Sequence, residues 1–106
     1  MRDIHQVTVY LTEVAASVDN YCKYLNQDSN EYAKILGYIF RVHQDQIRKV
    51  STQGLALMLF YLKDVNEDDY GKYIDVYAKK VDKILKRSNT LDEQFEKMEK
   101  LKKTIE

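Results

Sequence analysis

The chain has 106 residues with 17 Lys and Arg against 17 Asp and Glu, so its formal charge at neutral pH is zero. This length predicts one domain spanning residues 1–106 and excludes a two-domain enzyme. The single cysteine excludes an internal disulfide framework. The longest apolar run, Leu55 to Leu62, has eight residues, whereas a membrane helix needs roughly 20. We therefore expect a cytoplasmic protein with no membrane contact.

The chain contains no proline and three glycines, which are too few breakers for a fold of short strands, and this predicts an all-helical protein. The first helix is expected over residues 4–25. Apolar side chains recur there in steps of three and four residues, which places them on one stripe. The stripe is expected to face the core and consists of Ile4, Val7, Leu11, Val14, Val18, Tyr21 and Leu25.

A second helix is expected to begin near Asp28, because Asp28 and Glu31 have the spacing of a capping box. Apolar residues keep the helical period from there to Val50, and His43 lies on this apolar face. The simplest interpretation of His43 is a core or boundary histidine with a satisfied hydrogen bond; a catalytic or RNA-contacting role is the alternative. Ser51 can cap a third helix, although a continuous, kinked helix also fits the pattern.

Residues 54–62 are apolar on all sides, which predicts a central helix enclosed by its neighbours. Three consecutive acids at positions 67–69 then place negative charge at the start of a fourth helix over residues 70–85. Thr90 and Glu93 form a second capping-box pattern and open a last helix over residues 91–105. The predicted fold is an all-α, compact antiparallel bundle of about five helices around a central apolar helix.

The residues that usually carry catalysis or bind metals are sparse. His5 and His43 are far apart, Cys22 has no CxxC partner, and no glycine-rich phosphate loop or HExxH run occurs. We therefore expect no catalytic residues, no cofactor and no metal site, and we interpret Cys22 as a small buried hydrophobe.

The nine tyrosines are expected mainly in the core or at its boundary. Five of them fit the apolar stripes, with the ring inside and the hydroxyl outside: Tyr21, Tyr32, Tyr70, Tyr73 and Tyr77. The remaining four fit the stripes less well and are the candidates for surface contact with a base or a protein: Tyr10, Tyr24, Tyr38 and Tyr61.

Positive charge is concentrated in two stretches, residues 41–49 and 79–87. If the helices that carry them are neighbours, their cations would form one stripe that attracts phosphates. The predicted phosphate contacts are Arg41, Arg48, Lys49, Lys79, Lys80, Lys83, Lys86 and Arg87. The alternative is an ordinary solvated helix face whose cationic C-terminal end suits the helix dipole.

The segment from Ile47 to Lys63 resembles the signature region of the small helical subunit of type III-B CRISPR effector complexes, the Cmr small subunit, or its type III-A (Csm) counterpart. The similarity covers about residues 31–85. The residues that match the family pattern are Tyr32 and Leu36, followed by Gly54, Leu55, Leu59, Tyr61 and Leu62. Gly54 is expected to let two helices approach closely at the start of the enclosed helix.

The resemblance implies a non-catalytic role in which copies of the protein stack end to end in the minor filament, beside the other effector subunits. They would hold the crRNA and the single-stranded target RNA through a basic face, with no small-molecule substrate. Phosphate contacts of this kind leave sequence recognition to the guide. The alternative function is a helical protein-binding bundle, such as a bacteriocin immunity protein, with a groove around Tyr24, Tyr38 and the C-terminal helix.

Overall fold

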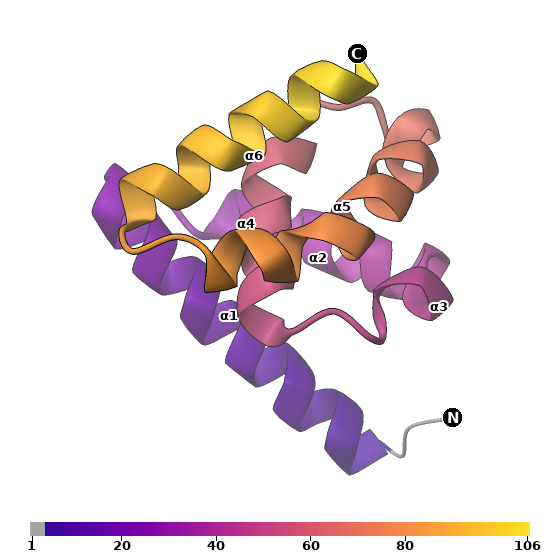
Figure 1. Cartoon of the computed structure of the whole chain (residues 1–106). Helices are drawn as coiled ribbons and strands as arrows, with labels where there is room; N and C mark the ends of the chain where they lie inside the picture. Colours follow the sequence, from indigo (N-terminus) through magenta and orange to yellow (C-terminus); the bar gives the residue numbers. More distant parts are fainter. Residues whose placement is uncertain (1–3) are drawn as a thin grey trace.

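Six α-helices and one short 3-10 helix make up residues 4–106, the part of the chain that the computed structural model describes, and these residues contain no strand (Figure 1). In chain order the helices are α1 (Ile4–Leu25), α2 (Asn30–Val42), α3 (Gln44–Ile47), α4 (Thr52–Leu62), η1 (Glu67–Asp69), α5 (Tyr70–Lys86) and α6 (Leu91–Ile105). The predicted all-helical bundle is therefore confirmed.

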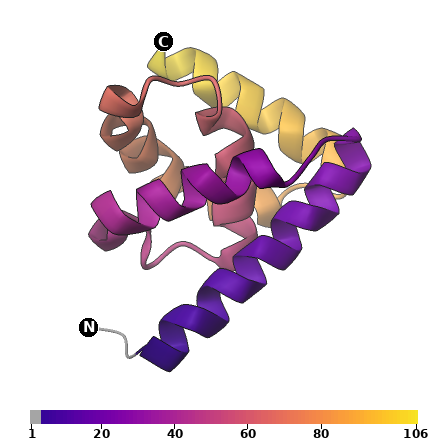
Figure 2. The same ribbon diagram turned by 180° about the vertical axis from the view of Figure 1, so that it is seen from behind.

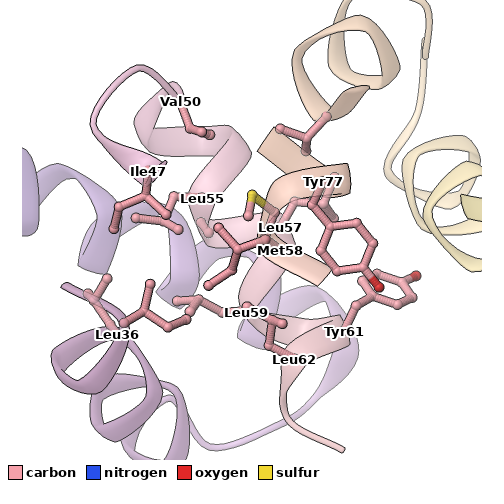
Figure 3. Close-up of a cluster of buried hydrophobic side chains, with 14 of the residues drawn as sticks. Leu36, Ile47, Val50, Leu55, Leu57, Met58, Leu59, Tyr61, Leu62 and Tyr77 are labelled. Atoms are coloured by element: carbon pink, nitrogen blue, oxygen red, sulfur yellow. The ribbon is translucent and has the colours of Figure 1, made fainter. Parts of the chain in front are cut away.

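Helix α4 lies at the centre of the bundle. Helices α5 and α2 lie on opposite sides of it, as the front view and the reversed view both show (Figures 1 and 2). Residues 55–59 of α4 are all 0% exposed, and Figure 3 shows their side chains packed among residues of α2, α3 and α5. The prediction of an enclosed apolar helix is confirmed, and burial of these side chains is the main source of the core's stability.

The first turn of α4 lies close against α5. Ser51 caps α4 as predicted, because its Oγ accepts a hydrogen bond from the Gly54 N–H at 3.0 Å and donates one to Asp82 Oδ1 on α5 at 2.7 Å. A Cβ atom at Gly54 would lie 2.9 Å from Ser51 Oγ and 3.1 Å from both Val81 Cγ1 and Asp82 Oδ1. A side chain at position 54 would press on Ser51 and on α5, so glycine suits this close contact, as expected from the sequence.

The predicted second helix is interrupted, so the expectation of an unbroken helix up to Val50 was wrong. Helix α2 ends at Val42, His43 leaves the helical conformation at φ −122° and ψ 26°, and the four-residue α3 follows. The Gln46 amide bridges the break: its Oε1 lies 2.8 Å from His43 Nδ1, and its Nε2 donates to Asp75 Oδ1 on α5 at 2.8 Å. Ile47 and Val50 are buried all the same, which explains why the apolar period continues across the break.

Two predicted details at helix starts also differ. Asp28 and Glu31 do not form a capping box, because Ser29 immediately precedes α2 and Asp28 Oδ1 accepts from the Asn30 N–H at 3.0 Å. At α6, Thr90 Oγ1 accepts from the Glu93 N–H at 3.2 Å, as expected. The Glu93 carboxylate, however, reaches back to the N–H of the residue before Thr90.

The buried stripe of α1 begins later than predicted. Ile4 is 86% exposed, because the N-terminal end of α1 extends past the rest of the bundle (Figure 1). Among the buried residues of α1, Tyr10 is the first. The expectation that Ile4 faces the core was therefore wrong, whereas Val14, Val18 and Tyr21 are buried as expected.

The placement of several tyrosines differs from the prediction. Tyr21 was expected to keep its hydroxyl in solvent, but it is 2% exposed and its hydroxyl donates to Gln94 Oε1 on α6 at 3.0 Å. Tyr10 and Tyr61 were candidates for surface contact, but both are buried, and their hydroxyls donate to the Val50 carbonyl at 3.2 Å and the Phe95 carbonyl at 2.7 Å. Tyr77 was expected to keep its hydroxyl in solvent; it is 0% exposed, and its hydroxyl has no hydrogen-bond partner among residues 4–106. Burial raises the pKa of both Tyr61 and Tyr77.

Candidate nucleic-acid interface

Five basic residues at the C-terminal end of α5, four in its last turns and Arg87 at its C-cap, lie on one face of the helix. At 3.6 residues per turn they span about 120° of the helix circumference, and the opposite face buries Tyr73, Tyr77 and Val81 against the core. All five are exposed, and within the described part of the chain none of them has an acidic partner at ion-pair distance. We call this surface the α5 basic face; it consists of Lys79, Lys80, Lys83, Lys86 and Arg87.

A shallow groove of about 360 Å³ lies between α5 and α6, which run in opposite directions and are joined by a short loop (Figure 1). Its lining combines apolar side chains with four cations and no acid: Ile84, Leu101, Lys80, Lys83, Arg87 and Lys97. We call it the α5–α6 groove. Lys97 belongs to α6, and its Nζ donates to the backbone carbonyl of Arg87 at 2.6 Å, which holds this cation beside the end of α5.

Lys97 was not among the residues predicted from the sequence. A signal for it exists in the helical hairpin, because residues at equal distances from the short loop lie opposite each other. Lys97 is the seventh residue of α6, and the seventh residue from the end of α5 is Lys80. The position of Lys97 can be predicted in this way only once α5 and α6 are known to be antiparallel neighbours.

Arg41 lies apart from these cations. Its guanidinium carbon is 5.7 Å from the centre of the Tyr38 ring, and that ring meets the Tyr70 ring edge to face at 5.7 Å. Tyr70 is the first residue of α5 and precedes Lys79 by nine residues, which is about 14 Å along a helix. The structure therefore places Arg41 at the end of α5 opposite to the α5 basic face.

Arg48 and Lys49 follow α3, and an acidic edge separates them from the α5 basic face. The residues on either side of them, Gln46 and Ser51, hydrogen-bond to Asp75 and Asp82 of α5. The edge of α5 that faces this segment thus carries carboxylates. The eight predicted phosphate contacts fall into two groups. Five form the α5 basic face, with Lys97 beside them, and three lie in the α2–α3 region.

The other two candidate residues, His43 and Cys22, are engaged in contacts within the protein. His43 is half-buried and bound to Gln46, as the simpler interpretation predicted. Cys22 is 3% exposed, and its pKa is raised first by burial and then by the nearby carboxylates of Asp19 and Asp28, so the thiol form is favoured and the interpretation of a buried hydrophobe is confirmed. Residues 4–106 contain no group of three or more His, Cys, Asp or Glu side chains able to hold a metal ion.

A second cavity, of about 410 Å³, lies where the ends of α1 and α4 meet α6. Its wall includes four aromatic rings, those of Tyr32, Phe60, Tyr61 and Phe95, and we call it the aromatic cleft. Its rim carries both signs of charge: Lys63 is bound to Glu31 at 2.7 Å, and Asp64, Glu96, Glu99 and Lys102 complete it. The mixed rim does not attract a polyanion.

Tyr24 and Tyr38, the two remaining candidates for surface contact, are engaged within the protein. Tyr24 is 45% exposed, but its ring stacks on Phe95 at 6.3 Å and its hydroxyl donates to Asp92, both on α6. Tyr38 is half-buried between Arg41 and Tyr70.

Comparison with known protein families, curated proteins and solved structures gives no match for this chain. Within residues 4–106, each helix is either too short or too polar to cross a lipid bilayer.

Proposed function

We propose that the protein is a non-catalytic RNA-binding module that holds the phosphate backbone of single-stranded RNA on the α5 basic face. The observation that carries this proposal is the collection of five cations on one exposed helix face, with a sixth, Lys97, supplied by α6. Because these cations have no acidic partners in the described chain, their field is available to an external anion even though the net charge is zero.

The bundle supports such a role because it fixes the helix that carries the charges. Tyr77 and Val81 of α5 are 0% exposed, and Asp82 is bound to the cap of α4 at Ser51. The acids of α5 are thereby directed toward α3 and α4, and its cations toward solvent and α6. A rigid positive face of this kind contacts phosphates without reading base sequence.

The finer proposal is that the protein is a small subunit of a type III CRISPR effector complex in the cytoplasm, one of several stacked copies that contact the crRNA and target RNA. The resemblance of the Gly54–Leu62 segment supports it. Each copy would contribute weak binding, and several copies on one RNA would bind tightly through avidity. This segment is buried in α4, so packing of the core by itself also favours its residue pattern. The proposal therefore has to be tested by measuring RNA binding.

A protein-binding bundle is the second candidate, and the aromatic cleft is the observation that favours it. Partly exposed Phe60 and Phe95 side chains at its wall could receive an apolar side chain of a partner helix. A protein of this kind would bind single-stranded RNA no better than a protein without a basic face does. Measured RNA binding therefore separates the two candidates.

The salt dependence of RNA binding tests the proposal. Each phosphate neutralised on a single strand contributes about 0.7 to the slope of log affinity against log salt concentration. The double variant Lys83→Gln with Arg87→Gln should therefore flatten the slope by about 1.4, with helix propensity largely kept.

The matched control is the double variant Arg41→Gln with Lys49→Gln, which removes the same charge from the α2–α3 region. It should leave the slope close to that of the unmodified protein. Equal flattening by both variants would mean that net charge alone governs binding, and no RNA binding by the unmodified protein would remove the proposed function.

A further inference from the structure

The cations of the α5–α6 groove converge on one place instead of forming a track. Lys80, Lys83 and Arg87 line one wall, and Lys97 lines the other. Lys79 and Lys86 belong to the α5 basic face but do not line the groove. The basic surface thus has an open part, suited to a continuous backbone, and a hollowed part with positive charge on both sides.

Lys97 lines the groove and is held there by a hydrogen bond to the backbone of Arg87. One of its three N–H donors is used by the Arg87 carbonyl at 2.6 Å, which leaves two donors for a ligand. Arg87 adds a planar guanidinium that can bind two phosphate oxygens at once. The lining between these cations is apolar, formed by Ile84 and Leu101.

The charge of the groove suits a phosphate monoester better than a diester. A diester inside an RNA strand carries one negative charge, whereas a monoester carries about 1.5 to 2 charges at pH 7 and offers three acceptor oxygens. Four cations around one small groove exceed what a single diester can neutralise. The apolar lining suits the sugar and base attached to such a phosphate.

We propose that the α5–α6 groove binds the terminal phosphate monoester of an RNA strand, with the terminal nucleoside lying over Ile84 and Leu101. This inference rests on the proposed RNA-binding function and adds an end preference to it. The terminal phosphate is held by Arg87, Lys83 and Lys97, while the following diesters contact Lys79 and Lys86 on the α5 basic face.

The test compares one short single-stranded RNA with three different ends, namely a 5′-hydroxyl with a 3′-hydroxyl, a 5′-phosphate, and a 3′-phosphate. Fluorescence anisotropy at one fixed salt concentration should show about tenfold tighter binding of one or both phosphate-ended strands than of the hydroxyl-ended strand. Adenosine monophosphate should compete with the phosphate-ended strand at concentrations that leave the hydroxyl-ended strand bound.

Three single variants with the same charge change separate the groove from the rest of the face. Lys97→Gln should abolish the preference for phosphate ends, and Lys83→Gln should reduce it. Lys86→Gln, outside the groove, should weaken binding of all strands by the same factor and keep the preference. Circular dichroism verifies that each variant retains its helical content.

The outcomes distinguish the two proposals. Equal affinity for all three strands would overturn the end preference and leave backbone binding intact. A preference that survives in the Lys97→Gln protein would place the terminal phosphate elsewhere and overturn the assignment to this groove. Absence of binding to every strand would overturn both proposals.

Discussion

Replacing Gly54 or Gly37 by alanine should change stability in opposite directions, although the chemical change is the same. Both residues lie in helices. A Cβ atom at Gly37 has nothing within 4 Å, whereas one at Gly54 would come within 2.9 Å of Ser51 Oγ and 3.1 Å of Val81 and Asp82. The comparison isolates the close approach of α4 and α5 from the intrinsic preference of alanine for helix.

The magnitudes follow from these surroundings. Gly37→Ala, in the exposed interior of α2, should stabilise the protein by about 0.5–1 kcal/mol, because alanine is the better helix former. Gly54→Ala gains less from propensity because it lies in the first turn. The added methyl group forces the Ser51 side chain away from its capping position on α4, which costs about 1 kcal/mol. It also overpacks the contact with Val81, which costs about 1–3 kcal/mol. The expected net destabilisation is about 1–3 kcal/mol.

Urea unfolding followed by circular dichroism measures both changes. The unfolding midpoint should rise for Gly37→Ala and fall for Gly54→Ala, with unchanged dependence on urea in both cases. If Gly54→Ala were as stable as the Gly37→Ala variant, α4 and α5 would not meet at Gly54 as described, and the account of the central helix would be wrong.

Further predictions concern the two buried tyrosine hydroxyls. Tyr61→Phe should lower the free energy of unfolding by about 1 kcal/mol, because it removes the hydrogen bond to the Phe95 carbonyl. Tyr77→Phe should leave it unchanged or raise it by about 1 kcal/mol, because it removes a buried hydroxyl without a partner in the described chain. Urea unfolding at pH 7 measures both. Burial raises the pKa of both hydroxyls above the ordinary value of 10.0, so the unfolded chain ionises first. The contribution of these two hydroxyls to stability should therefore be level below about pH 10 and fall above it by up to about 1.4 kcal/mol per pH unit for each hydroxyl. Urea midpoints between pH 8 and 11.5 should show this decline, and the Tyr61→Phe, Tyr77→Phe double variant should show a weaker one; a decline of the same steepness would mean that other groups cause it.

Features set by local pattern could be predicted from the sequence. The apolar composition of residues 55–62 predicts an enclosed helix, and the hydroxyl of Ser51 predicts where that helix begins. The clustering of cations in residues 79–87 predicts that part of the candidate site, because residues so close together on one helix share a face.

Features that depend on contacts between distant segments could not be predicted in the same way. The break at His43 depends on Gln46, which binds Asp75 on α5, and no proline or glycine marks it. The exposure of Ile4 depends on where the neighbours of α1 end. Tyr61 has an apolar ring and a polar hydroxyl, and α6 decides its burial by supplying the Phe95 carbonyl.

The candidate site shows the same division. Arg41, Arg48 and Lys49 carry the right charge for a stripe shared with α5, but Asp75 and Asp82 line the edge of α5 that faces the α3–α4 segment. Lys97 lies outside the cation-rich residues 79–87, ten residues after Arg87, yet it lines the same groove because α6 folds back along α5.

The most direct test of the proposed function is amide chemical-shift mapping of the isotopically labelled protein during titration with single-stranded RNA. The largest changes should cluster in residues 79–87 and at Lys97. Changes centred on the aromatic cleft or on residues 41–49, or no changes at all, would contradict it.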